Sequence, residues 1–406
     1  MKLRLNSEFG TLRSVLIHRP GKEIDRLTPY NISDLLFEDV PYLEEMQVEH
    51  DSFTNIIKQV SGAKVYRLTN LLGQVLKDKK LLLNVFEEIL ADSGLSFLAQ
   101  DVIETISTAE ATTALVAGLK VKELKKKLHN KALDKHQDNE FLIQPYPNLY
   151  FMRDPAALVQ TGVISSQMKY PARQRESMIL KLVLENHPDF KENYQPISLN
   201  SDNTNSLTSI EGGDVIVLSK KALAIGRSER TDAEAIEEVA KQVLKDDQVE
   251  RVYEVDLPRK RNFMHLDTVF TIIDENLVVT YPDAVNSVLE TKVYYKKAQD
   301  SDGNVILGIH NLGESILNIL KIEFPHLDII ETGYGNPDYA SREQWFDGAN
   351  VFAIGPRQVI SYNRNRYTNR ALKEAGVEVI EIRGSELVRG LGGPRCMTMP
   401  LERDEI

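Results

Sequence analysis

Two stretches of this chain repeat one pattern without a gap, and this repetition constrains the fold more than any other feature. One begins at Glu211, EGGDVIVLSKKALAIGRSERTDAEAI, and the other at Asp347, DGANVFAIGPRQVISYNRNRYTNRAL. Each reads as an acid, a glycine, a strand, a turn, a second strand, an arginine and the start of a helix. The arginine, Arg230 or Arg366, stands nineteen residues after the acid. A third segment places Arg173 nineteen residues after Asp154.

Weaker copies of the pattern start at TLRSVLIH and at LDTVFTIIDENLVVTYPDAV, whose leading acid is Asp267. Five strand–strand–helix units predict an α/β fold arranged as a closed pseudo-symmetric ring. In such a ring Asp154, Glu211 and Asp267 would come from corresponding places and converge on one central cleft. The alternative is that acids before glycine or proline are turn residues.

A helical block interrupts the strand-rich pattern. Leu71, Leu72, Val75 and Leu76 form one apolar stripe, and no strand-like run follows for some seventy residues. We therefore expect an inserted helical bundle at residues 71–145, between two portions of the α/β part at residues 1–70 and 146–406.

Composition excludes several classes of protein. With 42% hydrophobic and 27% charged residues the chain can bury a core and remain dissolved. The net charge of −11 argues against binding to the phosphate backbone of nucleic acid, which needs a basic face. The first residues lack a continuous apolar run, and no later run has the length of a membrane span. We expect a cytoplasmic protein with neither nucleic acid nor membrane as a partner.

The chain has one cysteine, Cys396, within GGPRCMTMP. A lone cysteine makes no internal disulfide and supplies no thiolate cluster for zinc, so Cys396 is either an inert packed residue or a reactive one. Its glycine-rich approach, RGLGGPRC, suits a movable active-site loop better than a core strand. That setting favours the reactive alternative.

His265 and Asp267 lie two residues apart in MHLDTVF and would share one face of a strand. Such a pair alone is typical of a structural contact or a partial metal site, but no further metal motif accompanies it. With Cys396 it offers a thiolate nucleophile and an imidazole proton carrier. Three carboxylates beside them suit a planar cation with several N–H donors, which is a guanidinium.

Together, the motifs NLYFMRDP, EGGDV, MHLDTVF, EQWFDGANV and GGPRCMTMPL resemble arginine deiminase, of the guanidino-group-modifying enzyme superfamily. The resemblance runs from HRPGKE to the C-terminus. It implies a five-bladed α/β propeller, the pentein fold, with a helical domain inserted after the first blade. It also implies hydrolysis of L-arginine to citrulline and ammonia without a metal or organic cofactor.

Residue by residue, the resemblance implies that Cys396 attacks the guanidinium carbon while Asp154 and Asp267 hold its nitrogens. His265, supported by Glu211, would protonate the departing ammonia and then activate water. The substrate α-carboxylate would bind Arg173 and Arg230. The remaining residues at the amino-acid end of the substrate would be Asn148, Phe151, Leu36 and the carbonyl of Gly390.

One departure from the family pattern concerns Leu391, which stands where many relatives carry an arginine. The departure removes an arginine that could close over the empty site. Three alternatives share the expected scaffold: an agmatine deiminase, an amidinotransferase and a noncatalytic arginine-binding protein. Paired carboxylate-binding arginines argue against agmatine, which has no carboxylate. We also expect a homo-oligomer.

Overall fold

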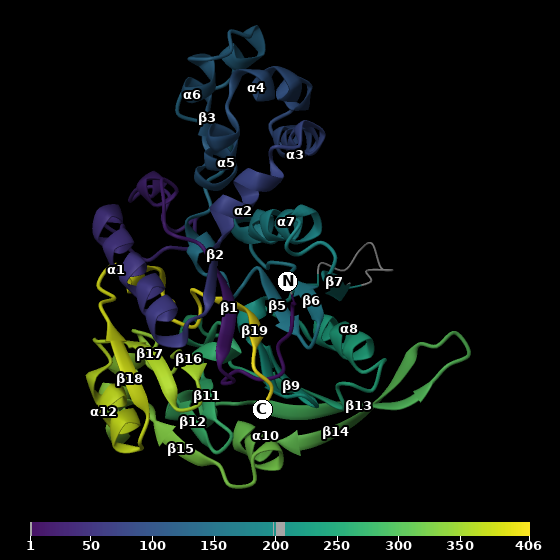
Figure 1. Cartoon of the computed structure of the whole chain (residues 1–406), viewed down its shortest axis with the longest axis vertical. Helices are drawn as coiled ribbons and strands as arrows, with labels where there is room; N and C mark the ends of the chain where they lie inside the picture. Colours follow the sequence, from purple (N-terminus) through teal and green to yellow (C-terminus); the bar gives the residue numbers. More distant parts are fainter. Residues whose placement is uncertain (1, 198, 200–207) are drawn as a thin grey trace.

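A computed structural model of the chain describes residues 2–197, 199 and 208–406 (Figure 1). Within these residues, five of the sheets contain one and the same arrangement of three strands. Two neighbouring strands pair antiparallel, and a third lies parallel to the middle one. The repeated strand pattern predicted from the sequence is therefore confirmed.

The strands of these units have the following bounds. They are β19 (Met399–Arg403), β1 (Leu12–Ile17) and β2 (Lys64–Arg67); β5 (Ala156–Val159), β6 (Gly162–Ser165) and β7 (Gln195–Ile197); β8 (Val215–Ser219), β9 (Ala222–Arg227) and β10 (Arg251–Asp256); β11 (Phe270–Asp274), β12 (Leu277–Thr280) and β15 (Asp328–Glu331); and β16 (Phe352–Gly355), β17 (Gln358–Tyr362) and β18 (Glu378–Ile382).

A helical connection joins the middle strand to the third strand in every unit. These crossovers contain α1 (Leu43–Ile56), α7 (Pro171–Asn186), α8 (Ala233–Val243), α9 (Pro282–Val285) with α10 (Ile316–Glu323), and α12 (Arg366–Glu374). A parallel pair requires such a crossover, because a tight turn can join only antiparallel strands. A further helix, α11 (Pro337–Gln344), precedes β16. In α8, Ile236 and Val239 belong to the buried apolar face.

The first unit is built from segments at opposite ends of the sequence. β19 pairs antiparallel with β1, with Val15 opposite Pro400 and Leu16 opposite Met399, and β1 runs parallel to β2. The sequence pattern at TLRSVLIH indicated only one strand of this unit. Its outer partner, β19, begins three residues after Cys396, so the same pairing also helps to place the cysteine.

A long hairpin leaves the repeated pattern. Its strands, β13 (Glu290–Gln299) and β14 (Val305–Gly313), follow α9 and extend the sheet of β8–β10, because β13 pairs antiparallel with β10. In Figure 1 the hairpin projects away from the other elements. No sequence pattern predicted this hairpin.

The helical block forms the upper part of Figure 1. Its helices are α2 (Leu68–Val75), α3 (Lys79–Ala91), α4 (Ala99–Thr105), α5 (Thr108–Ala117) and α6 (Val121–Lys125). The block also contains a short antiparallel pair, β3 (Leu119–Lys120) with β4 (Phe141–Ile143), too short to show a period in sequence. Its apolar residues, Phe86 and Leu115 among them, belong to one core cluster with Val217 and Leu223 of the sheets.

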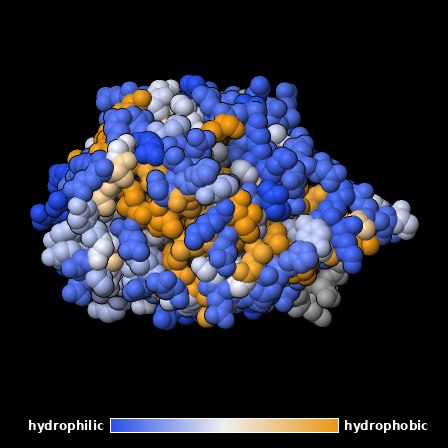
Figure 2. Space-filling model, turned by 90° about the horizontal axis from the view of Figure 1, so that it is seen from below, coloured by the Kyte–Doolittle hydropathy of each residue, from blue (hydrophilic) through white to orange (hydrophobic). Residues whose placement is uncertain are grey.

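The surface includes an apolar face. Figure 2 shows hydrophobic side chains gathered across the underside of the molecule. Elements at the lower edge of Figure 1 carry exposed isoleucines: Ile309 on β14, Ile322 on α10 and Ile329 on β15. A face of this kind is typical of protein interfaces. Among the described residues, no helix is both long and apolar enough to cross a bilayer.

The inserted block offers a local test of its stability. Ser107 caps α5: its hydroxyl accepts a hydrogen bond from Glu110 N, and the Glu110 side chain accepts from Ser107 N, which completes a capping box. We expect Ser107→Ala to lower the free energy of unfolding by about 1 kcal/mol, because one helix N–H loses its partner. Chemical denaturation measures this loss. Thr113→Ala, an exposed position in the same helix, is the control and should cost less.

Candidate active site

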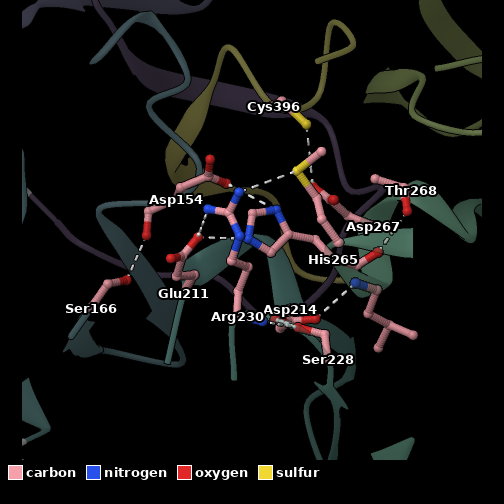
Figure 3. Close-up of polar contacts among 12 residues, drawn as sticks. Asp154, Ser166, Glu211, Asp214, Ser228, Arg230, His265, Asp267, Thr268 and Cys396 are labelled. Carbon is pink, nitrogen blue, oxygen red and sulfur yellow. Dashed lines mark hydrogen bonds and ion pairs between the residues drawn. The ribbon is translucent and has the colours of Figure 1, made fainter. Parts of the chain in front are cut away.

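The acids that begin the repeats meet at the centre of the molecule (Figure 3). Asp154 precedes β5, and Glu211 precedes the 3-10 turn η6 (Gly212–Asp214) and β8. His265 and Asp267 lie at the turn η8 (Leu266–Thr268), which precedes β11. The expectation that this pair lies on one face of a strand is therefore wrong. His265 is extended, but the following residues turn, and the turn directs both side chains inward.

Nine of the eleven residues predicted from the sequence line one cavity of about 20 Å³. This volume holds about one water molecule, so a substrate requires the site to open. The other two, Glu211 and Asp267, are fully buried and contact His265 and Cys396 respectively. The nine lining residues are Leu36, Asn148, Phe151, Asp154, Arg173, Arg230, His265, Gly390 and Cys396.

His265 is held between two carboxylates. Its Nε2 lies 2.8 Å from Glu211 Oε2, and its Nδ1 lies 3.7 Å from Asp154 Oδ1. Burial opposes the charged imidazolium, but Asp154 and the hydrogen bond to Glu211 outweigh burial and raise the pKa of His265 to about 9. Burial likewise opposes the charge on Glu211, but Arg230 and His265 lower the pKa of Glu211 to about 2. At neutral pH the pair is therefore an imidazolium beside a carboxylate.

Cys396 lies on the other side of the site. Its backbone N–H donates to Asn350 Oδ1 over 3.0 Å, and its Sγ lies 3.6 Å from Asp267 Oδ2. Burial raises the pKa of the Cys396 thiol well above its ordinary value, and the charges of Asp267 and Asp154 raise it further. A cation that enters between these acids offsets part of their negative charge and so makes the thiolate less unfavourable.

Two carboxylate oxygens at the site are buried without a hydrogen bond. Among the described residues, Asp154 Oδ1 and Asp267 Oδ1 are buried and accept none. The second oxygen of each acid is engaged, because Arg173 Nη1 lies 2.8 Å from Asp154 Oδ2 and Arg395 Nη1 lies 2.6 Å from Asp267 Oδ2. Unbonded buried acceptors are costly, so this pair is suited to a ligand that donates two N–H groups.

The two cavity arginines have different surroundings. Arg173 donates from Nε and Nη2 to Glu176, one turn along α7, and from Nη1 to Asp154. These bonds leave one N–H on each terminal nitrogen. Arg230 lies over the Tyr170 ring, 4.6 Å from its centroid, with Nη1 3.4 Å from Glu211 Oε2. Both guanidinium groups are buried, which requires nearby negative charge.

A segment that contains Leu36 covers the cavity. Leu36 and Leu391 both line it, and both have left-handed backbones, with φ of 60° and 59°. Asn148 Nδ2 donates to Leu35 O over 2.7 Å. Two ion pairs fasten the same segment: Arg261 with Glu38, and Arg389 with Asp39. These arginines contact the covering segment, whereas Leu391 contributes an apolar wall.

The glycines before Cys396 have a packing role that the sequence analysis did not anticipate. A Cβ on Gly392 would lie 2.0 Å from Cε1 of Phe151, and one on Gly393 would lie 2.6 Å from Asn350 O. A larger residue at either position would collide with the wall of the site.

In the described part of the chain, Asp154, Glu211 and His265 are the group whose ligand atoms are spaced for a metal ion, all within 4.8 Å of one another. The same carboxylates already pair with Arg173 and Arg230. A metal cation would have to compete with these two guanidinium groups.

Several contributors escaped the sequence analysis. Arg395 and Glu176 neutralise charges next to the predicted residues, and Met264 and Thr268 line the cavity. Arg395 directly precedes the cysteine, and Glu176 lies one turn after Arg173. In the sequence, these residues stand out only because they lie near predicted site residues. Nearness in sequence does not tell whether a side chain contacts the site or lies on the surface.

Comparison with known proteins accounts for this arrangement. The family model of arginine deiminase matches residues 33–403. The chain belongs to the arginine deiminase family. An arginine deiminase from Staphylococcus haemolyticus is 39% identical over 416 residues and aligns over 100% of this chain and 99% of its own length. Arginine deiminase 1 from Staphylococcus epidermidis is 37% identical with the same coverage.

Solved structures share the fold at low identity. The N-terminal domain of ArgZ, described as an arginine dihydrolase and bound to product, matches with a TM-score of 0.55 at 15% identity over 97% of this chain and 98% of that one. DDAH from Pseudomonas aeruginosa, in complex with citrulline, matches with a TM-score of 0.52 at 15% identity over 96% and 99%. These neighbours have the mixed α/β pentein fold, as predicted.

Membership of the arginine deiminase family also establishes the reaction. The chain hydrolyses a C–N bond of arginine, so that citrulline and ammonia form. The resemblance stated from the sequence motifs is confirmed, and so is the class of enzyme.

The electrostatics of the site predict how the lone thiol reacts. The raised pKa of Cys396 keeps the thiol protonated near neutral pH. We expect inactivation by iodoacetamide, without substrate, to accelerate about tenfold per pH unit through pH 8.5, where an ordinary thiol levels off. Residual activity after timed exposure gives the rate. A plateau below about pH 8.5 would contradict the assigned electrostatics.

Proposed function

We propose that Cys396 is the nucleophile of arginine hydrolysis and that Asp154 and Asp267 orient the substrate guanidinium. The observation that carries this proposal is the pair of unbonded oxygens, Asp154 Oδ1 and Asp267 Oδ1, on acids that lie 3.7 Å from His265 and 3.6 Å from Cys396 respectively. Each would accept N–H groups of the guanidinium, which presents its carbon to Sγ. The incoming cation would also favour the thiolate over the thiol, whose proton would leave to solvent as the substrate binds.

His265 would transfer protons in both halves of the reaction. Sγ forms a bond to the guanidinium carbon, and the C–N bond to the departing nitrogen breaks when the imidazolium gives that nitrogen a proton. Ammonia leaves an S-alkylthiouronium. Water then loses a proton to the neutral imidazole and adds to the same carbon, and the C–S bond breaks to release citrulline. The Glu211 carboxylate stabilises the imidazolium at the beginning and end of this cycle.

The amino-acid end of the substrate would lie at the opposite side of the cavity. The free N–H groups of Arg173 and the guanidinium of Arg230 would bind the α-carboxylate, with Asn148 beside them. Phe151, Leu36 and the carbonyl of Gly390 would enclose the aliphatic part. Agmatine, which lacks the carboxylate, would leave both arginines without this partner.

We also propose a specific architecture for the chain. The five equivalent strand units support a five-bladed propeller, and helices α2–α6 support an inserted bundle at residues 71–145. Residues 1–70 and 146–406 would then form the catalytic part. A homo-oligomer stays a prediction, supported by the apolar face in Figure 2.

Replacement of the nucleophile tests the covalent mechanism. We expect Cys396→Ser to fold normally and to lose more than about 99% of citrulline formation, because a serine hydroxyl beside several acids is not ionised. Citrulline and ammonia assays measure the activity, and thermal unfolding checks the fold. Substantial turnover by a folded Cys396→Ser protein would refute the covalent step.

Replacement of Arg230 tests the carboxylate site. We expect Arg230→Leu to lower kcat/KM for arginine by more than tenfold and to leave kcat/KM for agmatine little changed, because a charge-assisted bond of about 1.5–3 kcal/mol is lost only with arginine. Steady-state kinetics on both substrates measure the ratio.

Arg366→Leu is the matched control for this variant. Arg366 occupies the equivalent place in the repeat that starts at Asp347, but it is exposed and does not line the cavity. We expect this control to behave like the unmodified chain. An equal loss on arginine and agmatine in a well-folded Arg230→Leu protein would mean that Arg230 does not bind the carboxylate.

A further inference from the structure

Asp214 is a buried carboxylate to which the proposed mechanism gives no role. It is fully buried and accepts three hydrogen bonds from donors on two segments of the chain. Its Oδ2 accepts from the hydroxyl of Ser228 over 2.7 Å (Figure 3). The same oxygen accepts from the hydroxyl of Thr231 over 2.7 Å, and Oδ1 accepts from Leu266 N over 2.9 Å. It does not line the cavity, so it does not touch the substrate.

Each donor to Asp214 leads to a residue of the active site. Leu266 follows His265 directly, so its N–H fixes the backbone that carries the imidazole. Ser228 Oγ accepts from Arg230 N over 2.9 Å, and Thr231 Oγ1 accepts from Glu211 N over 3.1 Å. One carboxylate therefore holds the backbones of a proton carrier, its acidic partner and a carboxylate-binding arginine.

The neighbouring strand is shaped to admit this carboxylate. A Cβ on Gly226, in β9, would lie 2.3 Å from Asp214 Oδ1. Any other residue at that position would displace the carboxylate or the strand. The approach of Asp214 to Leu266 depends on this glycine.

The internal repeat contains a counterpart. When EGGDV is set above DGANV, Asp214 aligns with Asn350. Asn350 also links two segments of the site: its Oδ1 accepts from Cys396 N over 3.0 Å, and its Nδ2 donates to Asp267 O over 2.9 Å. Equivalent positions in two units therefore fasten different halves of the same active site.

The two counterparts differ in charge in a way that suits their neighbours. Asp214 faces His265, which carries a positive charge before the first proton transfer, and its negative charge favours the imidazolium. Asn350 faces Cys396 and Asp267, which are negative at the time of attack. A carboxylate there would oppose the thiolate, whereas a neutral amide does not.

We propose that Asp214 and Asn350 are paired positioning residues, one anionic and one neutral, which fasten the His265 and Cys396 halves of the site and match their charges. This inference rests on the proposed roles of His265 and Cys396. Burial raises the pKa of Asp214 itself to about 7, and His265 opposes that rise, so the two charges support each other. The other charged groups around His265 are Asp154, Glu211, Asp347, Arg173 and Arg230.

The test replaces Asp214 by asparagine, which keeps the shape and removes the charge. We expect Asp214→Asn to move the titration of the His265 imidazole, and the basic limb of kcat/KM for arginine, by about one pH unit toward lower pH, because a nearby negative charge is lost. NMR of histidine ring carbons follows the titration directly. The His265 signal is identified by its absence from the spectrum of His265→Ala.

Two controls separate charge from packing. Thr231→Ser keeps the hydroxyl that bonds Asp214 and removes only a methyl group, so it alters packing, keeps the charge and should not move the titration. Glu254→Gln changes another buried carboxylate, bonded to Tyr294 on the sheet of β8–β10, and should change stability alone. If Asp214→Asn only lowers the thermal midpoint, as Glu254→Gln does, and the imidazole titrates as in the unmodified chain, the proposal is wrong.

Asn350→Asp tests the role of Asn350 beside Cys396. This test does not depend on whether the Asp214→Asn protein folds. We expect the added charge to shift iodoacetamide inactivation of Cys396 toward higher pH and to lower kcat/KM at least tenfold. An unchanged inactivation profile in a folded protein would overturn the pairing. Failure of the proposed function can be told apart from failure of this pairing, because only the former would appear as turnover by the Cys396→Ser protein.

Discussion

The structure depends on the neutralisation of several acids buried at one point. Asp154, Glu211 and Asp267 start three equivalent units, and their side chains are almost entirely removed from water. Isolated buried charges are costly, so each acid must have a cationic partner. Arg173, His265 with Arg230, and Arg395 provide these partners. Two of these contacts, His265 with Glu211 and Arg395 with Asp267, join segments from different units, so the electrostatic requirement also bears on how those units are arranged.

A fourth acid shows what happens without such a partner. Asp347 starts the repeat nearest the cysteine, and burial together with the charge of Asp267 raises the pKa of Asp347 to about 8. It is therefore mainly protonated at neutral pH and adds little to the negative charge around Cys396. The negative charges of Asp267 and Asp154 still disfavour a thiolate at Cys396 when no substrate is bound. A cationic substrate would offset this negative charge, so the proposed nucleophile, Cys396, would be most reactive when arginine is present.

The sequence predicted the repeated strand units and most of the residues that line the candidate active site. The nineteen-residue spacing anticipated the central acids, and the motifs that contain Cys396 and His265 anticipated two residues that line the same cavity. The pairing of β1 with β19 was not predictable, because no local pattern links strands so far apart. Arg395 and Glu176 were missed for a related reason. Whether such a side chain is buried against an acid depends on packing between units, and its own neighbours in sequence do not reveal it.

The pairing of β1 with β19 also bears on the order of folding. It joins segments separated by almost the entire sequence, whereas every other unit pairs its first two strands across a short turn. Closure of so long a loop costs more chain entropy and is slow compared with the formation of local hairpins. Cys396 lies three residues before the start of β19 and contacts Asp267 and Asn350 in the folded chain. Slow closure of this loop predicts that Asp154, Glu211 and His265 come together before Cys396 reaches them, so that a partly folded chain would hold its thiol outside the site.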